Sequence, residues 1–259
     1  MKAELEGQVA VITGAGGFIG SGIARKLAAD GALVVVQDYA LRNAEKVAAE
    51  IVEKGGKAFA IGGDITDAAQ VEKMAAEVLS KTGKVDILVN NAGINSGADG
   101  RTTVESFQDD LWNAITAVDL DGTYNCTKHF TQSMVKAGKG RVINISSVAG
   151  VVALRKQCAF VAAKSGVLGF TRALAAEMGQ YGICMNAIAP GSITNADWRK
   201  VAGSAALDSL LSHIPLGRQG YAEDVANAVA FLCDPDSSYI SGAMLTVDGG
   251  WTCGFMREW

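Results

Sequence analysis

The sequence predicts an α/β fold, in which one doubly wound parallel β-sheet of about seven strands is flanked by helices on both faces. Two observations predict this fold class. Short apolar runs alternate along the chain with longer stretches of helical spacing, and the first run ends in a glycine-rich turn, Gly14–Gly20. No linker, low-complexity segment or internal repeat interrupts the alternation, so residues 1–259 are expected to form a single domain.

The predicted strands are short apolar runs that end close to glycine, serine, asparagine or aspartate. Residues 32–38 are the clearest example, because a continuous apolar run is typical of a strand buried on both faces of a parallel sheet. In chain order the predicted strands are Val9–Thr13, Ala32–Asp38, Ala58–Ile61, Val85–Asn90, Gly140–Ile145, Ile183–Ile188 and Ala243–Val247.

The predicted helices lie between these strands and repeat apolar residues every three or four positions. The third of them is expected to be capped by Thr66 or Asp67. Residues 195–213 have no clear period. In chain order the predicted helices are Ile19–Asp30, Asn43–Lys54, Ala68–Thr82, Phe107–Lys136, Phe160–Gly179 and Glu223–Leu232.

The composition excludes several classes of partner. The formal net charge is −4 and the basic residues are scattered, so no nucleic-acid partner is expected. Five widely spaced cysteines without a CxxC pair, together with only two histidines, argue against a metal site. Reduced thiols of this kind are typical of a cytoplasmic protein, which is the expected location.

The amino-terminal apolar run ends in a glycine turn, so we interpret it as a first strand and not as a signal peptide. No uninterrupted apolar stretch reaches the roughly 18 residues that a transmembrane helix needs. We therefore expect no membrane partner, and a small molecule as the ligand.

The turn Thr13-Gly14-Ala15-Gly16-Gly17-Phe18-Ile19-Gly20 follows the first predicted strand and opens the first predicted helix. Glycines let the backbone turn sharply and approach a pyrophosphate, and the helix N-terminus supplies free N–H groups and a positive dipole. A tight turn without a ligand is the alternative. The strand before the turn, the helix after it and an acidic residue further on favour a Rossmann-type dinucleotide site that includes Gly14, Gly17, Phe18, Ile19 and Gly20.

Asp38 ends the second predicted strand, 24 positions after Gly14. A carboxylate there can accept the ribose hydroxyls of an adenosine, and it would repel a 2′-phosphate. No arginine or lysine lies in Ala15–Gly17 or immediately after Asp38. These observations favour NAD over NADP as the cofactor.

Further segments in the chain resemble the short-chain dehydrogenase/reductase superfamily, in its branch of about 250 residues. The resemblance covers essentially the whole chain. It rests on the glycine turn and on segments that close later predicted strands, which are Asn90-Asn91-Ala92-Gly93, Ser146-Ser147-Val148-Ala149-Gly150 with Lys164 seventeen residues after Ser147, Pro190-Gly191, and Asp248-Gly249-Gly250.

The resemblance implies roles for individual positions. Ser147 matches the serine that binds the substrate oxygen, and Lys164 matches the lysine that binds the nicotinamide ribose. The remaining positions are implied to bind the cofactor: Asn91, Ala92 and Gly93 at the sheet and on the adenosine side, Asp64 and the adjoining Ile65 at the adenine, and Pro190, Gly191 and Ile193 in the loop that holds the nicotinamide carboxamide.

The sequence departs from the superfamily's pattern at Phe160, thirteen residues after Ser147 and four before Lys164. The superfamily has its catalytic tyrosine there, on the same helix face as the lysine. Phenylalanine keeps the ring but has no proton to exchange. Losing a general acid or base typically lowers a rate by about 10²–10⁴. Tyr→Phe is also a substitution that traps substrates, but two further departures favour natural divergence.

Those departures are Asp119 and Phe18. Asp119 stands where the superfamily usually has an asparagine that holds a water, and a carboxylate there is expected to pair with Lys164. We hypothesise that Asp119, Lys164 and a water form a substitute proton relay; an equal alternative is an aspartate that only binds a kinked helix backbone. Phe18 replaces the middle glycine of the turn, and Gly17 can substitute for it.

The leading hypothesis is an NAD-dependent oxidoreductase that interconverts a secondary alcohol, such as a polyol, a sugar derivative or a cyclic alcohol, with its ketone. One alternative is a catalytically silent NAD-binding protein, for which Phe160 is the main support. Another is an isomerase or lyase that retains its NAD. The resemblance also implies a homotetramer, and a segment near residues 192–215 that covers the substrate.

Overall fold

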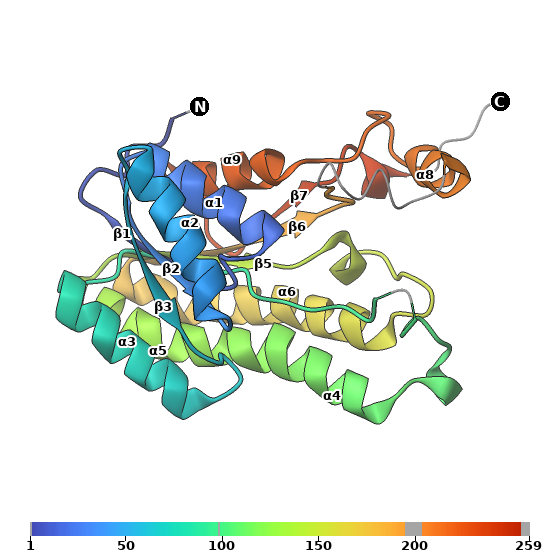
Figure 1. Ribbon diagram of the computed structural model, residues 1–259, viewed down its shortest axis with the longest axis horizontal. Helices are drawn as coiled ribbons and strands as arrows, with labels where there is room; N and C mark the ends of the chain where they lie inside the picture. Colours follow the sequence, from blue (N-terminus) through green and yellow to red (C-terminus); the bar gives the residue numbers. More distant parts are fainter. Residues whose placement is uncertain (1, 98, 195–203, 255–259) are drawn as a thin grey trace.

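Seven parallel strands form one sheet in the order β3-β2-β1-β4-β5-β6-β7 (Figure 1). The order reverses between β1 and β4, and doubly wound sheets bind ligands at such a reversal, outside the carboxyl ends of their strands. The predicted fold class is therefore confirmed. The strands are β1 (Val9–Ile12), β2 (Leu33–Asp38), β3 (Lys57–Gly62), β4 (Ile87–Asn90), β5 (Gly140–Ile145), β6 (Ile183–Pro190) and β7 (Met244–Val247).

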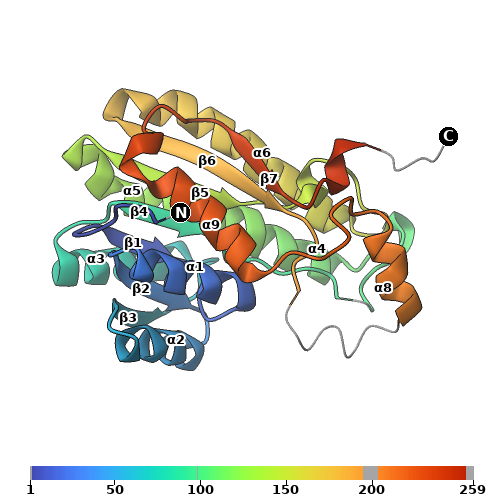
Figure 2. The same cartoon turned by 90° about the horizontal axis from the view of Figure 1, so that it is seen from above.

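Helices cover both faces of the sheet in this computed structural model, which describes residues 2–97, 99–194 and 204–254. One face carries α1 (Phe18–Ala29), α2 (Leu41–Glu53) and α9 (Ala222–Cys233), as Figures 1 and 2 show. The other face carries α3 (Ala68–Thr82), α4 (Asp109–Thr116), α5 (Gly122–Ala137) and α6 (Cys158–Met178). A further helix, α8, spans Ser204–Leu211.

The core consists of two apolar layers, one on each face of the sheet. Alternate residues of β1 supply both, because successive side chains of a strand point to opposite faces. Ala10 and Ile12 pack with Ile23 of α1 and Val229 of α9. Val9 and Val11 pack into the other layer, with the residues of α3 and α5. All four residues of β1 are buried, as expected for a strand in the middle of a parallel sheet.

Most predicted helix and strand ends differ from the observed ends by one or two residues, which is the usual scatter at frayed ends. Asp67 caps α3, because its side chain accepts from Ala69 N and Gln70 N. The predicted helix Phe107–Lys136 is the larger error: a π-helical turn, Ala117–Asp121, separates α4 from α5. A π-turn inserts one residue per turn, and here it places Asp119 inside the protein.

The part of the chain expected to cover a substrate, residues 192–215, is described only in part. Residues 195–203 and the tail from 255 lie outside the described residues. The prediction of an irregular segment over residues 195–213 is wrong for Ser204–Leu211, which form α8.

Among the described helices, the stretch Cys158–Tyr181 is long and apolar enough to cross a membrane by length and composition alone, with a mean hydropathy of 1.2 over its most apolar window. It is the helix that packs along β6 and carries Lys164 into the protein interior. Of that window, 33% is buried inside the structure, so packing on the sheet accounts for only part of its apolar character.

Three of the five cysteines are buried, Cys158 is half-buried and Cys253 is exposed. Burial raises the pKa of the Cys126 and Cys233 thiols to about 12. These two thiols therefore pack as small apolar side chains.

Candidate active site

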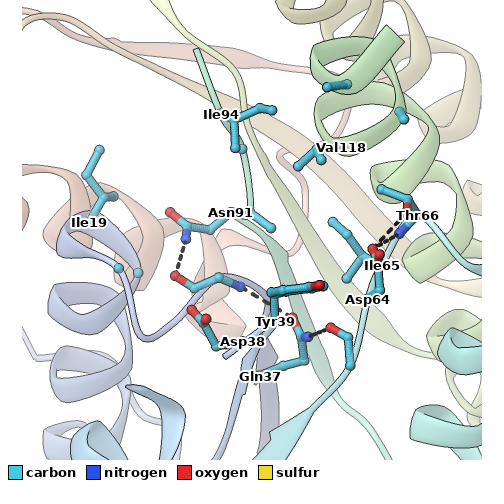
Figure 3. A pocket seen from close by; sticks show the side chains of 18 of the residues that line it. Ile19, Gln37, Asp38, Tyr39, Asp64, Ile65, Thr66, Asn91, Ile94 and Val118 are labelled. Atoms are coloured by element: carbon cyan, nitrogen blue, oxygen red, sulfur yellow. Dashed lines mark hydrogen bonds between the residues drawn. The ribbon is translucent and has the colours of Figure 1, made fainter. Parts of the chain in front are cut away.

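A pocket of about 780 Å³ opens beyond the carboxyl ends of β1, β2, β3 and β4, beside the reversal of strand order (Figure 3). Its walls come from the glycine turn, from the segments that follow β2, β3 and β4, and from α4 with the π-turn. The lining residues are Gly14, Gly17, Phe18, Ile19, Gly20, Gln37, Asp38, Tyr39, Gly63, Asp64, Ile65, Thr66, Asn91, Ala92, Gly93, Ile94, Ala114, Ala117 and Val118.

The glycine turn fits a pyrophosphate. Gly14 has φ +60°, and a Cβ on it would lie 2.7 Å from Ala92 Cα. A Cβ on Gly20 would overlap the Gly14 carbonyl and the Asn91 amide. No side chain caps α1 at Gly17, so the first N–H groups of the helix remain for an anionic ligand. The structure thus provides the close backbone approach that a dinucleotide requires.

Asp38 borders this pocket and is held from two sides. Its Oδ2 accepts from Gly16 N at 3.0 Å, and its Oδ1 accepts from Ala40 N at 3.0 Å. Two ionised carboxylate oxygens offer about four acceptor positions, so two remain for ligand hydroxyls. The carboxylate is therefore fixed in orientation and still able to bind.

The glycine turn is also tied to β4. Asn91 donates from Nδ2 to Thr13 O at 2.9 Å and to Gly14 O at 3.2 Å, as Figure 3 shows in part. Thr13 Oγ1 accepts from the backbone N–H groups of Asn91 and Ala92. These bonds bring the turn and the Asn-Asn-Ala-Gly segment together at one edge of the sheet.

The opposite wall of the pocket contains Asp64 and Ile65. Thr66 donates to Asp64 Oδ1 from both its backbone N–H and its hydroxyl, each at 2.8 Å. Ile65 is buried against Gly122, where a Cβ would lie 2.5 Å from the isoleucine. Tyr39, by contrast, is 79% exposed and lies across the mouth of the pocket between Asp38 and Asp64 (Figure 3).

The expected ion pair between Asp119 and Lys164 is present. Lys164 Nζ lies 3.0 Å from Asp119 Oδ2 and donates to Ile145 O at 3.2 Å, and both side chains are buried. Ile94 N donates to the other oxygen, Asp119 Oδ1, at 2.7 Å. Gly93 lies against the pair, since a Cβ on it would be 3.0 Å from Nζ. Asp119 thus binds both the lysine and a backbone N–H.

Burial raises the pKa of the Asp119 carboxyl above its ordinary value of 3.8, against the opposing effects of Lys164 and of the Ile94 N–H. This carboxyl therefore takes up a proton more readily than an exposed aspartate does. A buried carboxyl with a raised pKa beside an ammonium is a common arrangement in proton-transfer sites.

Phe160 and Lys164 lie on the same side of α6, with Nζ 5.7 Å from the centre of the phenylalanine ring. The predicted four-residue spacing therefore brings the two side chains together. Ser147 follows β5, and its Oγ accepts from Ala149 N at 3.1 Å. Ser147 follows β5, the other two residues lie on α6, and none of the three belongs to the lining of the pocket.

The loop after β6 is likewise separate from the pocket walls. Gly191 packs against Asp248, where a Cβ would lie 2.8 Å from the aspartate Cα. Ile193 packs against the core layer of α1 and α9 and bridges to Gly220. Pro190 is the buried last residue of β6.

Sequence reasoning missed Gln37, Tyr39, Thr66 and Ile94 as pocket residues. Gln37 is 1% exposed; its Oε1 accepts from Gly14 N at 3.4 Å and its Nε2 donates to Gly63 O at 2.8 Å. A polar residue inside an apolar strand was the available signal, because a buried amide needs hydrogen-bond partners. The other three carry no comparable signal.

Comparisons with known proteins identify the family of the chain. A family described as Enoyl-(Acyl carrier protein) reductase matches residues 14–252. A 3-oxoacyl-[acyl-carrier-protein] reductase from Synechocystis sp. is 39% identical over 249 residues, which cover 95% of this chain and 97% of the relative. The chain belongs to the short-chain dehydrogenase/reductase superfamily. Its predicted membership is therefore confirmed, and its relatives are oxidoreductases.

Comparison with solved structures also places the chain among the short-chain dehydrogenase/reductase folds. A gluconate 5-dehydrogenase from Burkholderia cenocepacia J2315, in complex with NADP and tartrate, has a TM-score of 0.92 at 34% identity and covers 98% of both chains. Levodione reductase has a TM-score of 0.90 at 31% identity and covers 97% of this chain and 100% of that one. These short-chain dehydrogenase/reductase structures share the fold over its whole length.

Proposed function

We propose that the chain is an NAD-dependent oxidoreductase that interconverts a secondary alcohol with its ketone. Membership of a superfamily of nicotinamide-dependent oxidoreductases supports the reaction class. Gluconate, in the name of one structural neighbour, is a polyhydroxy compound, which supports a polyol or sugar derivative as substrate. The name levodione reductase supports a ketone as the oxidised form of the substrate.

The choice of NAD rests on Asp38. Its carboxylate lies in the pocket that contains the glycine turn, and no lysine or arginine belongs to the described lining of that pocket. A 2′-phosphate would meet an anion without a compensating cation, which costs free energy. A neighbour at 34% identity was solved with NADP, so the proposed preference for NAD rests on the residues of this chain and not on that neighbour.

A nicotinamide dinucleotide, when bound, would accept or donate the hydride. The first turn of α1 would bind its pyrophosphate and Asp38 its adenosine ribose. Lys164 would contact the second ribose, and Ser147 would donate a hydrogen bond to the substrate oxygen. A hydroxyl donor polarises a carbonyl and stabilises the developing alkoxide.

In this proposal the proton moves between the substrate and Asp119 through Lys164 and a water. The 3.0 Å contact between Nζ and Oδ2 supports this path, as does the raised pKa of the carboxyl. Phe160 contributes ring packing beside Nζ but cannot exchange a proton.

One specific observation favours a second function: Phe160 leaves the site without a phenol at the position that the superfamily uses as its acid. A catalytically silent NAD-binding protein would have this substitution. Retention of Ser147 argues against it, because a protein that only binds NAD has no use for a hydroxyl directed at a substrate.

The test of cofactor choice is a titration of the chain with NAD and with NADP. We expect NAD to bind more tightly by at least about tenfold, because of the like-charge repulsion at Asp38. Asp38→Asn should reduce the ratio of the NADP dissociation constant to the NAD dissociation constant. Asp64→Asn is the matched control, because that carboxylate is bound by Thr66 and should leave the ratio unchanged. Equal binding of NAD and NADP by the wild-type chain would refute the proposed preference.

A further inference from the structure

Four buried polar side chains join α5 to α6 through the ends of β4 and β5. Asn90 and Asn144 are register partners in the sheet, and Asn90 Nδ2 donates to Asn144 Oδ1 at 2.8 Å. Asn90 Nδ2 also donates to Thr127 Oγ1 of α5 at 2.9 Å. On the other side, Asn144 Nδ2 donates to Thr171 Oγ1 of α6 at 2.9 Å. These four residues, all of them buried, are called the polar bridge below.

The polar bridge lies two helical turns from the buried ion pair on both helices. Thr127 follows Asp119 by eight residues, and Thr171 follows Lys164 by seven. Residues at these intervals share one face of a helix and lie roughly 10–12 Å apart along its axis. The two helices are therefore joined at two levels, once by the ion pair and once by the polar bridge.

The threonine hydroxyls of the bridge are fixed by their own helices. Thr127 Oγ1 donates to Thr123 O at 2.7 Å, and Thr123 Oγ1 in turn donates to Asp119 O at 2.8 Å. Thr171 Oγ1 donates to Val167 O at 2.8 Å. Because each bridge hydroxyl gives its single proton to a helix carbonyl, it meets the asparagine amide as an acceptor. A helix that shifts or rotates would break this contact.

Stability does not explain why these positions are polar. Asn90 Oδ1 is buried and accepts no hydrogen bond within the described part of the chain. An unpaired buried acceptor costs free energy, whereas apolar side chains such as those of Val89 and Ile143, one position earlier in each strand, avoid that cost. Hydrogen bonds, however, depend steeply on distance and angle. The polar bridge therefore favours one relative position of the two helices.

We propose that the polar bridge positions the ion pair of Asp119 and Lys164 for proton transfer. Its members are positioning residues, because they are buried and none of them lines the pocket. A proton moves only between groups at hydrogen-bond distance, so a small shift of α6 against the π-turn would lengthen the 3.0 Å contact and slow the reaction. This inference rests on the proposed function and adds the support of its relay.

The first test removes single hydroxyls of the bridge and follows turnover. Thr127→Val and Thr171→Val keep the shape of the side chain but lose the acceptor. Each should lower kcat by about tenfold or more and move the acid limb of the pH profile, because the ion pair is displaced. Each should leave the calorimetric dissociation constant for NAD unchanged. Thr127→Ser and Thr171→Ser keep the hydroxyl and should restore both kcat and the pH profile.

Thr131→Val is the matched control. Thr131 is a buried threonine one turn beyond Thr127, and its hydroxyl donates to a helix carbonyl but belongs to no contact of the bridge. Its variant should lose a similar amount of stability and keep the wild-type kcat and pH profile. Equal effects of Thr127→Val and Thr131→Val on kcat would overturn the positioning role while leaving the proposed function intact.

A second measurement does not depend on turnover. The coupling between Asp119 and Lys164 follows from the unfolding of Asp119→Asn, Lys164→Met and the double variant. Thr127→Val should weaken this coupling by at least about threefold in the unfolding equilibrium constant, and Thr131→Val should leave it unchanged. An unchanged coupling in Thr127→Val would overturn the inference. A wild-type chain without turnover, in which the coupling still depends on Thr127, would overturn the proposed function alone.

Discussion

At the scale of single residues, the proposed proton relay depends on how Asp119 is held. Its Oδ1 accepts a backbone N–H and its Oδ2 faces Lys164, so neither oxygen can leave without breaking a contact. The backbone N–H that Asp119 accepts belongs to Ile94, outside the helix, and its other oxygen pairs with Lys164. The alternative of an aspartate that only binds a kinked helix backbone is therefore wrong, and the proton relay stays a hypothesis. A fixed carboxyl of raised pKa is able to accept a proton at one defined atom.

Asp119→Asn is expected to change the pH dependence of turnover. The asparagine keeps the shape and an acceptor but takes up no proton. If Asp119 is in the relay, the acid limb of the kcat/KM profile should disappear or move, and the rate should fall by about tenfold or more. Steady-state kinetics over a pH series measures both. Asp121→Asn, two residues further on and exposed, is the matched control.

The same variant should alter the pH dependence of stability. In the folded protein Asp119 binds its proton more tightly than in the unfolded chain, so the native state holds more protons just above pH 3.8. The wild-type free energy of unfolding should therefore fall as pH rises through this window. Asp119→Asn lacks this slope, so its stability relative to wild type should increase with pH. Parallel curves for the two proteins would contradict a raised pKa.

At the scale of elements, the end of α6 shows how local backbone shape decides the effect of a glycine. Gly179 has helical angles, φ −57° and ψ −34°, and a Cβ on it would meet nothing within 4 Å. Gly182, three residues on, has φ +67°, and a Cβ would overlap the Gly138 carbonyl. Two glycines in one short connection therefore have opposite requirements.

Gly179→Ala should raise the free energy of unfolding by about 0.4–1 kcal/mol, because alanine restricts the unfolded chain and fits the native angles. Gly182→Ala should lower it by more than about 1 kcal/mol, through strain at positive φ and the overlap. Denaturant unfolding of both variants measures the difference. The same sign for both would contradict the described geometry.

The elements themselves were predictable where the apolar period was strong. β5 and α3 have the predicted bounds, and the buried run of β2 is correct within one residue. The π-turn was not predictable, because the sequence around Asp119 has the pattern of an ordinary long helix with a polar residue at this position. The buried ion pair that Asp119 forms with Lys164, 45 residues away, is a tertiary contact that stabilises the π-turn. A contact over this distance leaves no local signal in the sequence.

At the scale of the whole molecule, the sheet ends in β7, whose outer edge pairs with no other strand among residues 2–97, 99–194 and 204–254. Met244 and Leu245 of this strand are 41% and 37% exposed, and Leu216 beside it is 68% exposed. Exposed apolar side chains on an edge strand are typical of an interface. They are consistent with the homotetramer that the resemblance to the superfamily implies, and we propose β7 as one contact between copies.

Light scattering tests this assembly. The wild-type chain should have four times the mass of a single copy. Leu245→Glu should shift the assembly to a smaller mass, because the variant places glutamates of neighbouring copies opposite each other in the interface. Tyr239→Glu changes a fully exposed residue outside the strand and should leave the mass unchanged. A monomeric wild-type chain would contradict the proposal.

The superfamily was predictable from motifs that follow the strands, and so was the meeting of several predicted residues at one pocket. Asp38, Asp64 and Asn91 line that pocket at one edge of the sheet, and their binding of an adenosine stays a prediction. The identity of the substrate could not be predicted either, because no short sequence motif specifies which substrate is bound.

The most direct measurement is NADH formation from NAD over a panel of polyols, sugars and cyclic alcohols, with the wild-type chain and Phe160→Tyr in parallel. We predict that the wild-type chain turns over at least one of these alcohols. The tyrosine should add less than the roughly 10²-fold expected of a general acid, because Asp119 already pairs with the lysine that would activate it. Turnover by Phe160→Tyr alone would contradict this and identify the wild-type chain as a silent NAD-binding protein.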